Sequence, residues 1–445
     1  MWQAGSESRD VVITGVGVVC PLGLTAEELW TGLTEGRYGI GPFSLLGENS
    51  GRLPSAAEPL RIAAPVRQFT GSLDNFGPPP AEIAKSLRKG LKLMCRESQM
   101  AVAAALRALS DAGWQPDLFP SDRCGVVFGC DYLLTTPEEF IAAVRACTED
   151  GAFRFALWGE KGLSQMTPLW LLKYLPNMPA SHIAIYCQFC GPSNSITLRE
   201  AGGLVGIAEA ARIIAAGHAD LMVVGATGSR LHPMKIIHAL TQEQVVAGGE
   251  PATSCRPFDR QRRGTVLGEG AAAIVLESAE SAARRAAPVY GKIVACASAC
   301  QVGSSWQTDV EGALRQVLQR LISQEGKRRS TISFISAQGL GTRSGDRAEA
   351  RAIAGVFGQA NGAPPVVAAK AYLGHLGGAS AVTELIAGLL ALRAGELYPI
   401  RNFCHPDPEC PVNVVRESGM PAGDAFIQLA YTPQAQAAGV LVARV

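Results

Sequence analysis

Three ionisable residues stand where a carboxylate, an imidazole or an amine could do chemistry. Glu200 opens an apolar stretch with helical periodicity, and His375 lies in a glycine-rich turn shortly after Lys370. A carboxylate at a helix start is stabilised by the helix dipole by about 0.3–1 kcal/mol. If Glu200 is buried it needs a partner, because an isolated buried charge is costly. We therefore expect Glu200 to pair with Lys370 or His375, although a lone histidine in such a turn is usually structural.

The sequence contains no pattern for a metal site, a cofactor or a phosphate loop. Cys187 and Cys190 form one C-x-x-C pair among 12 cysteines, but no second pair or histidines follow at zinc-binding spacing. The stretch 341–345 (GTRSG) lacks the Lys-Ser/Thr ending of a phosphate-binding loop. The first residues do not resemble a secretory signal, and the cysteines show no regular spacing. Both features are typical of a protein whose thiols stay reduced. We expect no cofactor, no metal and a cytoplasmic location.

Composition points to a large, compact core. The chain has 445 residues, of which 47% are hydrophobic and only 18% charged, with a net charge of +1. This balance gives no reason to expect binding to nucleic acid or to an anionic membrane. No apolar run approaches the roughly 20 residues that a membrane helix needs. The chain is long enough for more than one ordinary domain.

Short apolar runs alternate with helical patterns along the whole chain. This alternation predicts an α/β fold with a parallel or mixed sheet covered by helices on both faces. The order repeats loosely, so we expect two α/β halves, residues 1–285 and 286–445. The predicted strands are Val11–Val16, Gly125–Phe128, Ile183–Tyr186, Leu221–Val224, Ala271–Leu276, Gly291–Ala297, Phe334–Ser336, Val366–Ala369 and Gly439–Val442. The predicted helices are Glu97–Asp111, Glu200–Ala216, Asp346–Val356 and Ala379–Ala394.

Four segments in the same order resemble the β-ketoacyl-(acyl carrier protein) synthase family. They are residues 11–40 (VVITGVGVVC…RYGI), 166–178 (MTPLWLLKYLPNM), 256–278 (RPFDRQRRGTVLGEGAAAIVLES) and 370–392 (KAYLGHLGGASAVTELIAGLLAL). The resemblance covers almost the whole chain. It implies a thiolase-like fold in which two similar βαβαβαββ halves form a five-layered α-β-α-β-α core.

The resemblance also places a remnant of the family's catalytic site. Active members hold a nucleophilic Cys at the start of a buried helix, two His residues and a Lys. Counting from Gly191-Pro192-Ser193, Glu200 falls on the Cys position. Gln338, in SAQGLGT, falls on the first His. The second His is retained as His375 and the Lys as Lys370.

The turn that gates the acyl pocket in active members is also changed. Its Gly-Phe-Gly-Gly is matched by Pro433-Gln434-Ala435-Gln436, which puts Gln434 on the gating Phe. The two carboxylates that follow the first His turn are matched by Asp346 and Glu349. A carboxylate at position 200 cannot form the acyl thioester of condensation, and an amide cannot replace an imidazole in proton transfer.

These changes imply a non-condensing partner subunit that resembles the chain-length factors of polyketide systems. Such subunits pair with an active ketosynthase and act with acyl carrier protein, and they usually carry Gln where this chain has Glu200. We expect a homodimer or a heterodimer, built on an apolar strand within residues 182–195. Two alternatives stay open: a malonyl-carrier-protein decarboxylase and a homodimeric acyl-binding scaffold.

Overall fold

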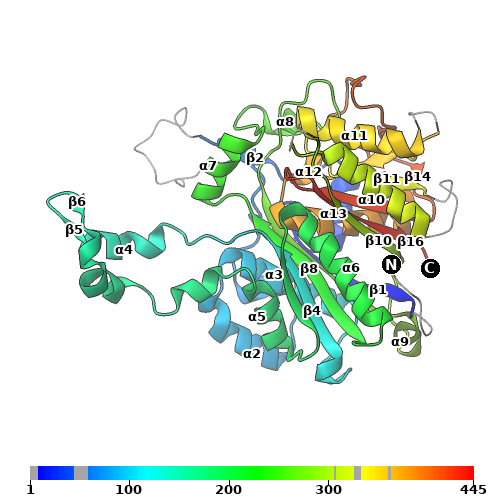
Figure 1. Cartoon of the computed structure of the whole chain (residues 1–445). Helices are drawn as coiled ribbons and strands as arrows, with labels where there is room; N and C mark the ends of the chain where they lie inside the picture. The colour runs from blue at the N-terminus through cyan, green and yellow to red at the C-terminus, as the bar shows by residue number, and fades with distance from the viewer. Residues whose placement is uncertain (1–8, 45–58, 305–306, 325–331, 359–361) are drawn as a thin grey trace.

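The computed structural model describes residues 9–44, 59–304, 307–324, 332–358 and 362–445 (Figure 1). Its large sheet has the strand order β12-β11-β15-β16-β10-β1-β9-β8-β4-β7. The ladder between β1 and β10 joins only Val11–Ile13 to Gly291–Ile293. This short link divides the ten strands into two mixed sheets of five.

The two sheets repeat one topology. In the first, β4 runs parallel to β7 and β8, and antiparallel pairs add β9 and β1. In the second, β11 runs parallel to β12 and β15, and antiparallel pairs add β16 and β10. The strands are β1 (Val11–Val19), β4 (Cys124–Cys130), β7 (Ser193–Thr197), β8 (Leu221–Ser229), β9 (Glu269–Ser278), β10 (Gly291–Cys300), β11 (Phe334–Ser336), β12 (Val366–Val367), β15 (Ala425–Tyr431) and β16 (Gln436–Ala443).

Helices cover both sheets and fill the space between them. One apolar cluster joins α6 and α13 to the inner faces of both sheets, and two further clusters pack α3 and α5, or α10 and α11, on the outer faces. The expected α-β-α-β-α layers are therefore present. The helices are α1 (Ala26–Thr34), α2 (Ala81–Gly90), α3 (Arg96–Asp111), α4 (Glu138–Ala146), α5 (Met178–Cys187), α6 (Gly202–Ala215), α7 (Pro233–Gln242), α8 (Pro251–Ser254), α9 (Ala279–Arg284), α10 (Val310–Gln324), α11 (Arg343–Phe357), α12 (Lys370–Leu373) and α13 (Ser380–Ala394).

The central helix α13 is apolar on all sides. Together with the turn before it, Gly377–Ala394 is long and apolar enough to cross a membrane by composition, but 89% of it is buried inside the protein. A helix buried between two sheets has no polar face, which explains this composition. It is therefore a core helix of the fold.

One predicted strand is wrong. The run Ile183–Tyr186 belongs to helix α5, in which Ile183, Tyr186 and Cys187 are buried while Ile185 is 61% exposed. That burial has the period of a helix, and Pro179 in the first turn favours helix initiation. The strand in this region is β7, which follows the helix and forms the outer edge of its sheet. Within residues 182–195, where a strand was expected at the dimer interface, His182–Cys187 are helix and only Ser193–Ser195 belong to a strand.

An arm leaves the body of the protein between β4 and α5. It carries α4 and the hairpin of β5 (Thr148–Glu149) and β6 (Ala152–Phe153), and it projects to the left in Figure 1. Phe155, Leu163 and Leu169 on this arm are 74%, 55% and 65% exposed. Exposed apolar residues gathered on a projecting segment are typical of a protein–protein contact.

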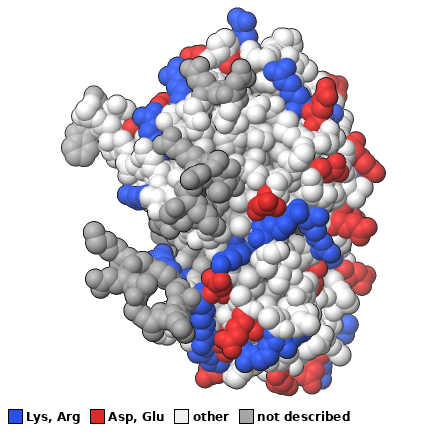
Figure 2. Space-filling model, turned by 90° about the vertical axis from the view of Figure 1, so that its right-hand side faces the viewer, with Lys and Arg blue, Asp and Glu red and all other residues white. Residues whose placement is uncertain are grey.

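The division of the chain near residue 285 lies between the end of β9 at Ser278 and the start of β10 at Gly291. It remains a proposal, because the two sheets share one inner core. On the face seen in Figure 2, basic and acidic side chains lie interspersed, as expected for a net charge of +1.

Candidate active site

Glu200 is positioned by a sharp turn between an edge strand and a buried helix. The chain leaves β7, and Arg199 adopts a left-handed conformation with φ of 46° before the one-turn helix η9 (Arg199–Ala201) continues into α6. A non-glycine residue in this region is strained and marks a functional or a tightly constrained turn. The turn buries Glu200, whose exposed fraction is 2%, at the N-terminal end of α6.

His375 is held by the turn that precedes α13. Gly374 has a φ of 68°, which lets the chain fold back, and the N–H of Gly377 donates to Nδ1 of His375 at 3.2 Å. The hydroxyl of Ser380 lies 3.2 Å from the same nitrogen. Because Nδ1 accepts a hydrogen bond from a backbone amide, the imidazole proton must sit on Nε2. His375 is therefore fixed as a donor through Nε2.

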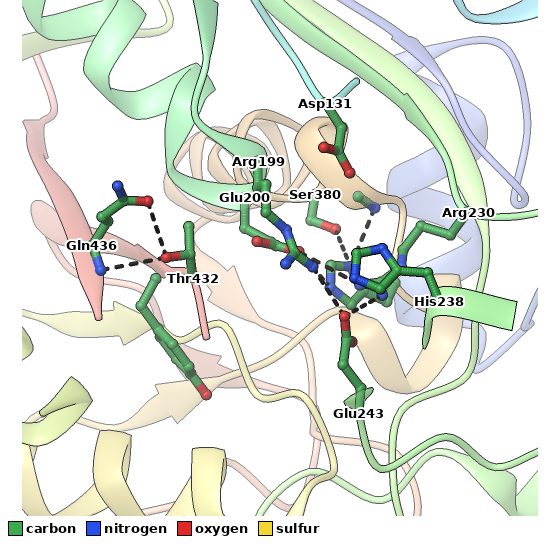
Figure 3. A network of polar contacts seen from close by, with 12 residues as sticks. Asp131, Arg199, Glu200, Arg230, His238, Glu243, Ser380, Thr432 and Gln436 are labelled. Carbon is green, nitrogen blue, oxygen red and sulfur yellow. Dashed lines mark hydrogen bonds and ion pairs between the residues drawn. The ribbon is translucent and has the colours of Figure 1, made fainter. Parts of the chain in front are cut away.

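Glu200, His375 and three further residues form a polar cluster, and Figure 3 shows Glu200 of this cluster with Arg199, Arg230 and Glu243 from close by. Nε2 of His375 lies 3.2 Å from Oε1 of Glu200. Arg199 and Arg230 each approach the same oxygen to 3.5 Å. Both arginines also bind Oε1 of Glu243, at 2.9 and 2.6 Å. Two carboxylates thus face two guanidinium groups in a largely buried pocket.

The surroundings determine the charge of the central pair. Burial alone would raise the pKa of Glu200, but the hydrogen bond from His375 and the charges of Arg199 and Arg230 hold it well below its usual range. Burial, followed by the charge of Arg230, lowers the pKa of His375 to about 4, although Glu200 acts in the opposite direction. At neutral pH the pair is an ionised carboxylate and a neutral imidazole.

Of the two partners expected for Glu200, His375 contacts it and Lys370 does not. The buried amine of Lys370 forms a short ion pair with Glu384 of α13. Burial raises the pKa of Glu384 to about 7, and the nearby Lys370 counteracts this. Lys370 therefore has a buried carboxylate partner of its own.

Gln338 is a buried link between two strands. Its side-chain amide donates to the carbonyl of Tyr431 at 2.9 Å, and its carbonyl accepts from the N–H of Tyr431 at 2.7 Å. The carboxylate of Glu349 accepts from the backbone N–H of Gln338 and Gly339 at 2.7 and 2.9 Å. Asp346 likewise accepts from the N–H of Gly341 at 3.0 Å. The matched carboxylates thus hold the turn, and the side-chain amide of Gln338 bonds to the backbone of Tyr431 through both its nitrogen and its oxygen.

Gln434 lies outside this cluster. It is exposed at the tip of the hairpin between β15 and β16, where the N–H of Ala435 donates to the carbonyl of Thr432 at 3.0 Å. Thr432 and Gln436 close the hairpin with a 3.3 Å contact between their side chains, seen at the left of Figure 3. A closed hairpin of this kind differs from a flexible glycine gate.

Sequence reasoning missed Arg199, Arg230 and Glu243. Arg230 follows directly on the fully buried strand β8, and Arg199 is adjacent to Glu200. A charge placed immediately after an apolar strand was the available signal, since strand ends often carry site residues. Glu243 lies just after α7, and nothing in its local sequence marks it.

Comparison with known proteins establishes the family. A family model described as "Beta-ketoacyl synthase, N-terminal domain" matches residues 8–282, and one described as "Beta-ketoacyl synthase, C-terminal domain" matches residues 290–404. The chain belongs to the β-ketoacyl synthase family. It is similar to 3-oxoacyl-(acyl-carrier-protein) synthase 2 of Synechocystis sp., at 30% identity over 418 residues, which cover 93% of this chain and 92% of the relative.

The mitochondrial 3-oxoacyl-(acyl-carrier-protein) synthase of Arabidopsis thaliana is also 30% identical, over 90% of this chain and 85% of its own length. A β-ketoacyl synthase from Burkholderia phymatum superposes with a TM-score of 0.82 at 25% identity, covering 98% of this chain and 100% of the other. The ishigamide ketosynthase/chain length factor shares the fold, with a TM-score of 0.80 at 24% identity over 98% and 100% of the two chains. The whole chain therefore has the β-ketoacyl synthase fold.

In this β-ketoacyl synthase family member, Cys130 does not offer a replacement nucleophile. Cys130, at the end of β4, is buried, and its thiol donates to the carbonyl of Pro176 at 3.1 Å. Burial, with a smaller contribution from Asp131, raises the pKa of Cys130 to about 12. A thiol with such a pKa is inert at neutral pH. Among the described residues, no group of three or more His, Cys, Asp or Glu side chains could hold a metal ion.

Proposed function

We propose that this chain is a non-condensing subunit of fatty-acid or polyketide synthesis that pairs with an active ketosynthase. The observation that supports this most directly is the buried, ionised Glu200 at the start of α6, bonded to His375. In the alignment of motifs this is the position of the nucleophilic Cys. A carboxylate held by two arginines cannot be acylated to a stable thioester, so the chain would take part in synthesis without carrying the growing chain covalently.

The possible decarboxylase function has less support. Decarboxylation of a malonyl thioester needs donors that stabilise the enolate oxygen. The donor of His375 is already bonded to Glu200, and the amide of Gln338 is bonded to the backbone of Tyr431. The single donor of His375 is therefore engaged within the chain, and the amide nitrogen of Gln338 already makes one hydrogen bond.

A partner of the same fold is supported by the edge of the first sheet and by the arm. Strand β7 has an unpaired outer edge in the described sheet, and such edges are usually covered in native assemblies. The arm beside it carries exposed apolar side chains that a partner would bury. Acyl carrier protein is the expected substrate carrier, since the similar synthases of Synechocystis and Arabidopsis are named for it.

A turnover assay tests the function. The purified chain is incubated with an acyl carrier protein loaded with acyl and malonyl groups, and 3-oxoacyl product and carbon dioxide are measured. The Synechocystis synthase serves as the positive control. We expect neither product above background from this chain alone. Formation of 3-oxoacyl product at a rate comparable to the control would refute the proposal, and carbon dioxide without product would favour the decarboxylase.

A further inference from the structure

The residues around Glu200 have the arrangement of a binding site for a carboxylate. An imidazole N–H and two guanidinium groups converge on one oxygen, at distances of 3.2, 3.5 and 3.5 Å. Charge-assisted donors of this kind, arginine above all, are the groups that proteins use to recognise carboxylates. Arg230 and His375 are themselves buried, with exposed fractions of 7% and 2%. These two donors are thus shielded from water, while Arg199 is partly exposed.

The fit between Glu200 and this site is incomplete. Its second oxygen, Oε2, is buried and has no hydrogen-bond partner among the described residues, and the same holds for Nε of Arg199. A buried carboxylate oxygen and a buried guanidinium N–H each lose hydration without a full replacement. The 3.5 Å contacts to both arginines are also long for charged hydrogen bonds, in contrast to the 2.6 Å contact between Arg230 and Glu243. The donors around Glu200 therefore retain unused hydrogen-bonding capacity.

The charges balance only while Glu200 is present. Arg199 and Arg230 contribute two positive charges, Glu200 and Glu243 two negative charges, and His375 is neutral at pH 7. Removing the carboxylate of Glu200 leaves two arginines in contact with one carboxylate, that of Glu243, while Asp131 acts on Arg199 only through its charge. An uncompensated buried charge is strongly unfavourable, so the pocket would then attract a small anion.

We propose that Arg199, Arg230 and His375 form a carboxylate-binding site that Glu200 fills from within the chain. The occupied site excludes an external carboxylate such as that of a malonyl group, and it accepts a small carboxylate once Glu200 is shortened. This inference rests on the proposed function. That proposal says that the pocket lacks a nucleophile, and the inference adds that the side chain of Glu200 fills it.

Chemical rescue with acetate tests the inference. Replacing Glu200 with Ala removes one methylene group and one carboxylate, which together have the size of an acetate ion. Wild type, Glu200→Ala and Glu200→Gln are heated at pH 7 with increasing sodium acetate, at constant ionic strength set by chloride. Acetamide, which has the same shape without the charge, is the matched control for the additive. We expect acetate to raise the Tm of Glu200→Ala in proportion to the logarithm of its concentration above its Kd, by about 1–3 °C at ten times its Kd.

Wild type and Glu200→Gln should show no such increase, because the side chain still fills the site. A double variant, Glu200→Ala with Arg230→Gln, should lose the response. An equal effect of acetamide, or an equal effect of acetate on wild type, would show that no specific site exists. If Glu200→Ala does not fold, Glu200→Ser, whose side chain is likewise too short to fill the site, replaces it.

If neither variant folds even when acetate is present, the pocket does not accept an external carboxylate and the inference is wrong. The readout is binding and not turnover. A failed rescue therefore leaves the proposed loss of condensation standing, whereas condensation by the wild type would overturn the proposed function without affecting this measurement.

Discussion

At the scale of single residues, the pairing of Glu200 with His375 decides what the site can do. General acid–base catalysis is most efficient when the pKa of the group lies near the working pH. The arginines and the imidazole hold the pKa of Glu200 far below neutrality, and burial lowers that of His375 to about 4. Neither group changes its protonation state near pH 7. The pair is therefore suited to holding a structure and not to transferring protons.

The lowered pKa of His375 predicts a pH dependence of stability. Because its folded-state pKa of about 4 lies below the unfolded value of 6.5, the unfolded chain binds more protons between these pH values. The free energy of unfolding should therefore fall as pH is lowered from about 6.5 to 4, by about 1.4 kcal/mol per pH unit from this group. Urea unfolding at several pH values should show this fall in the difference between wild type and His375→Gln.

Other buried groups make the comparison with a variant necessary. Burial raises the pKa of Glu349 to about 8 and that of Glu384 to about 7, and these carboxyl groups destabilise the fold as pH rises. Their effect is common to wild type and variant, so it cancels in the difference. His218→Gln, at an exposed histidine, is the control and should keep the wild-type profile. An unchanged profile in His375→Gln would contradict the assignment of a neutral His375.

Restoring the thiol alone should not restore condensation. In Glu200→Cys the two arginines would favour the thiolate, so we expect faster alkylation by iodoacetamide than for Cys130. Turnover should nevertheless stay at least about 100-fold below that of an intact synthase, because the amide of Gln338 supplies no acid–base function. The measurement is 3-oxoacyl product formed per active thiol. A single variant that approaches the rate of the Synechocystis synthase would show that Glu200 is the only defect.

At the scale of elements, hydrophobic periodicity predicted the strands and helices that are buried among apolar neighbours. Continuous apolar runs gave β1, β4, β8 and β9, and the helical pattern gave α3 and α13. Strands β7 and β15 were missed. Strand β7 is a polar edge strand (SNSIT) with three of its five residues exposed, and β15 (AFIQLAY) carries a buried Gln428 that breaks its apolar run. Periodicity reports burial, so it fails where a strand lies at an edge or buries a polar group.

The candidate site was predictable only in part for a similar reason. The motifs located Glu200, Gln338, Lys370 and His375, and of the two expected partners of Glu200 the structure shows His375. The positions of the arginines depend on contacts between the end of β8, the turn before α6 and the loop after α7. Contacts between segments so distant in the sequence leave no local pattern.

The projecting arm gives a prediction at the same scale. If its apolar residues are buried by a partner, Phe155→Asp together with Leu169→Asp should weaken association by at least about tenfold, since buried aromatic and leucine anchors dominate such interfaces. Sedimentation or light scattering over a range of concentrations measures this. Val289→Asp is the matched control, at an exposed apolar residue before β10. A wild-type chain that stays monomeric, alone and with a ketosynthase, would contradict the partner assignment.

At the scale of the whole molecule, two repeated halves place the remnant site next to the shared core. The helices α6 and α13 lie between the sheets, and their N-terminal ends bring Glu200 and the turn of His375 together (Figures 1 and 3). The described residues keep the fold of the family, and the buried pair of Glu200 and His375 lies in its core without a group that titrates near pH 7. This combination favours a retained structural role over a decaying protein.

The most direct test of the account is the intact mass of the wild-type protein after incubation with an acyl thioester of acyl carrier protein. The predicted result is an unchanged mass, because Glu200 is an ionised, arginine-bound carboxylate and Cys130 is a buried thiol with a pKa of about 12. The Synechocystis synthase, treated in the same way, is the positive control. A stoichiometric acyl adduct on this chain, mapped to Glu200 or to a cysteine, would contradict the account.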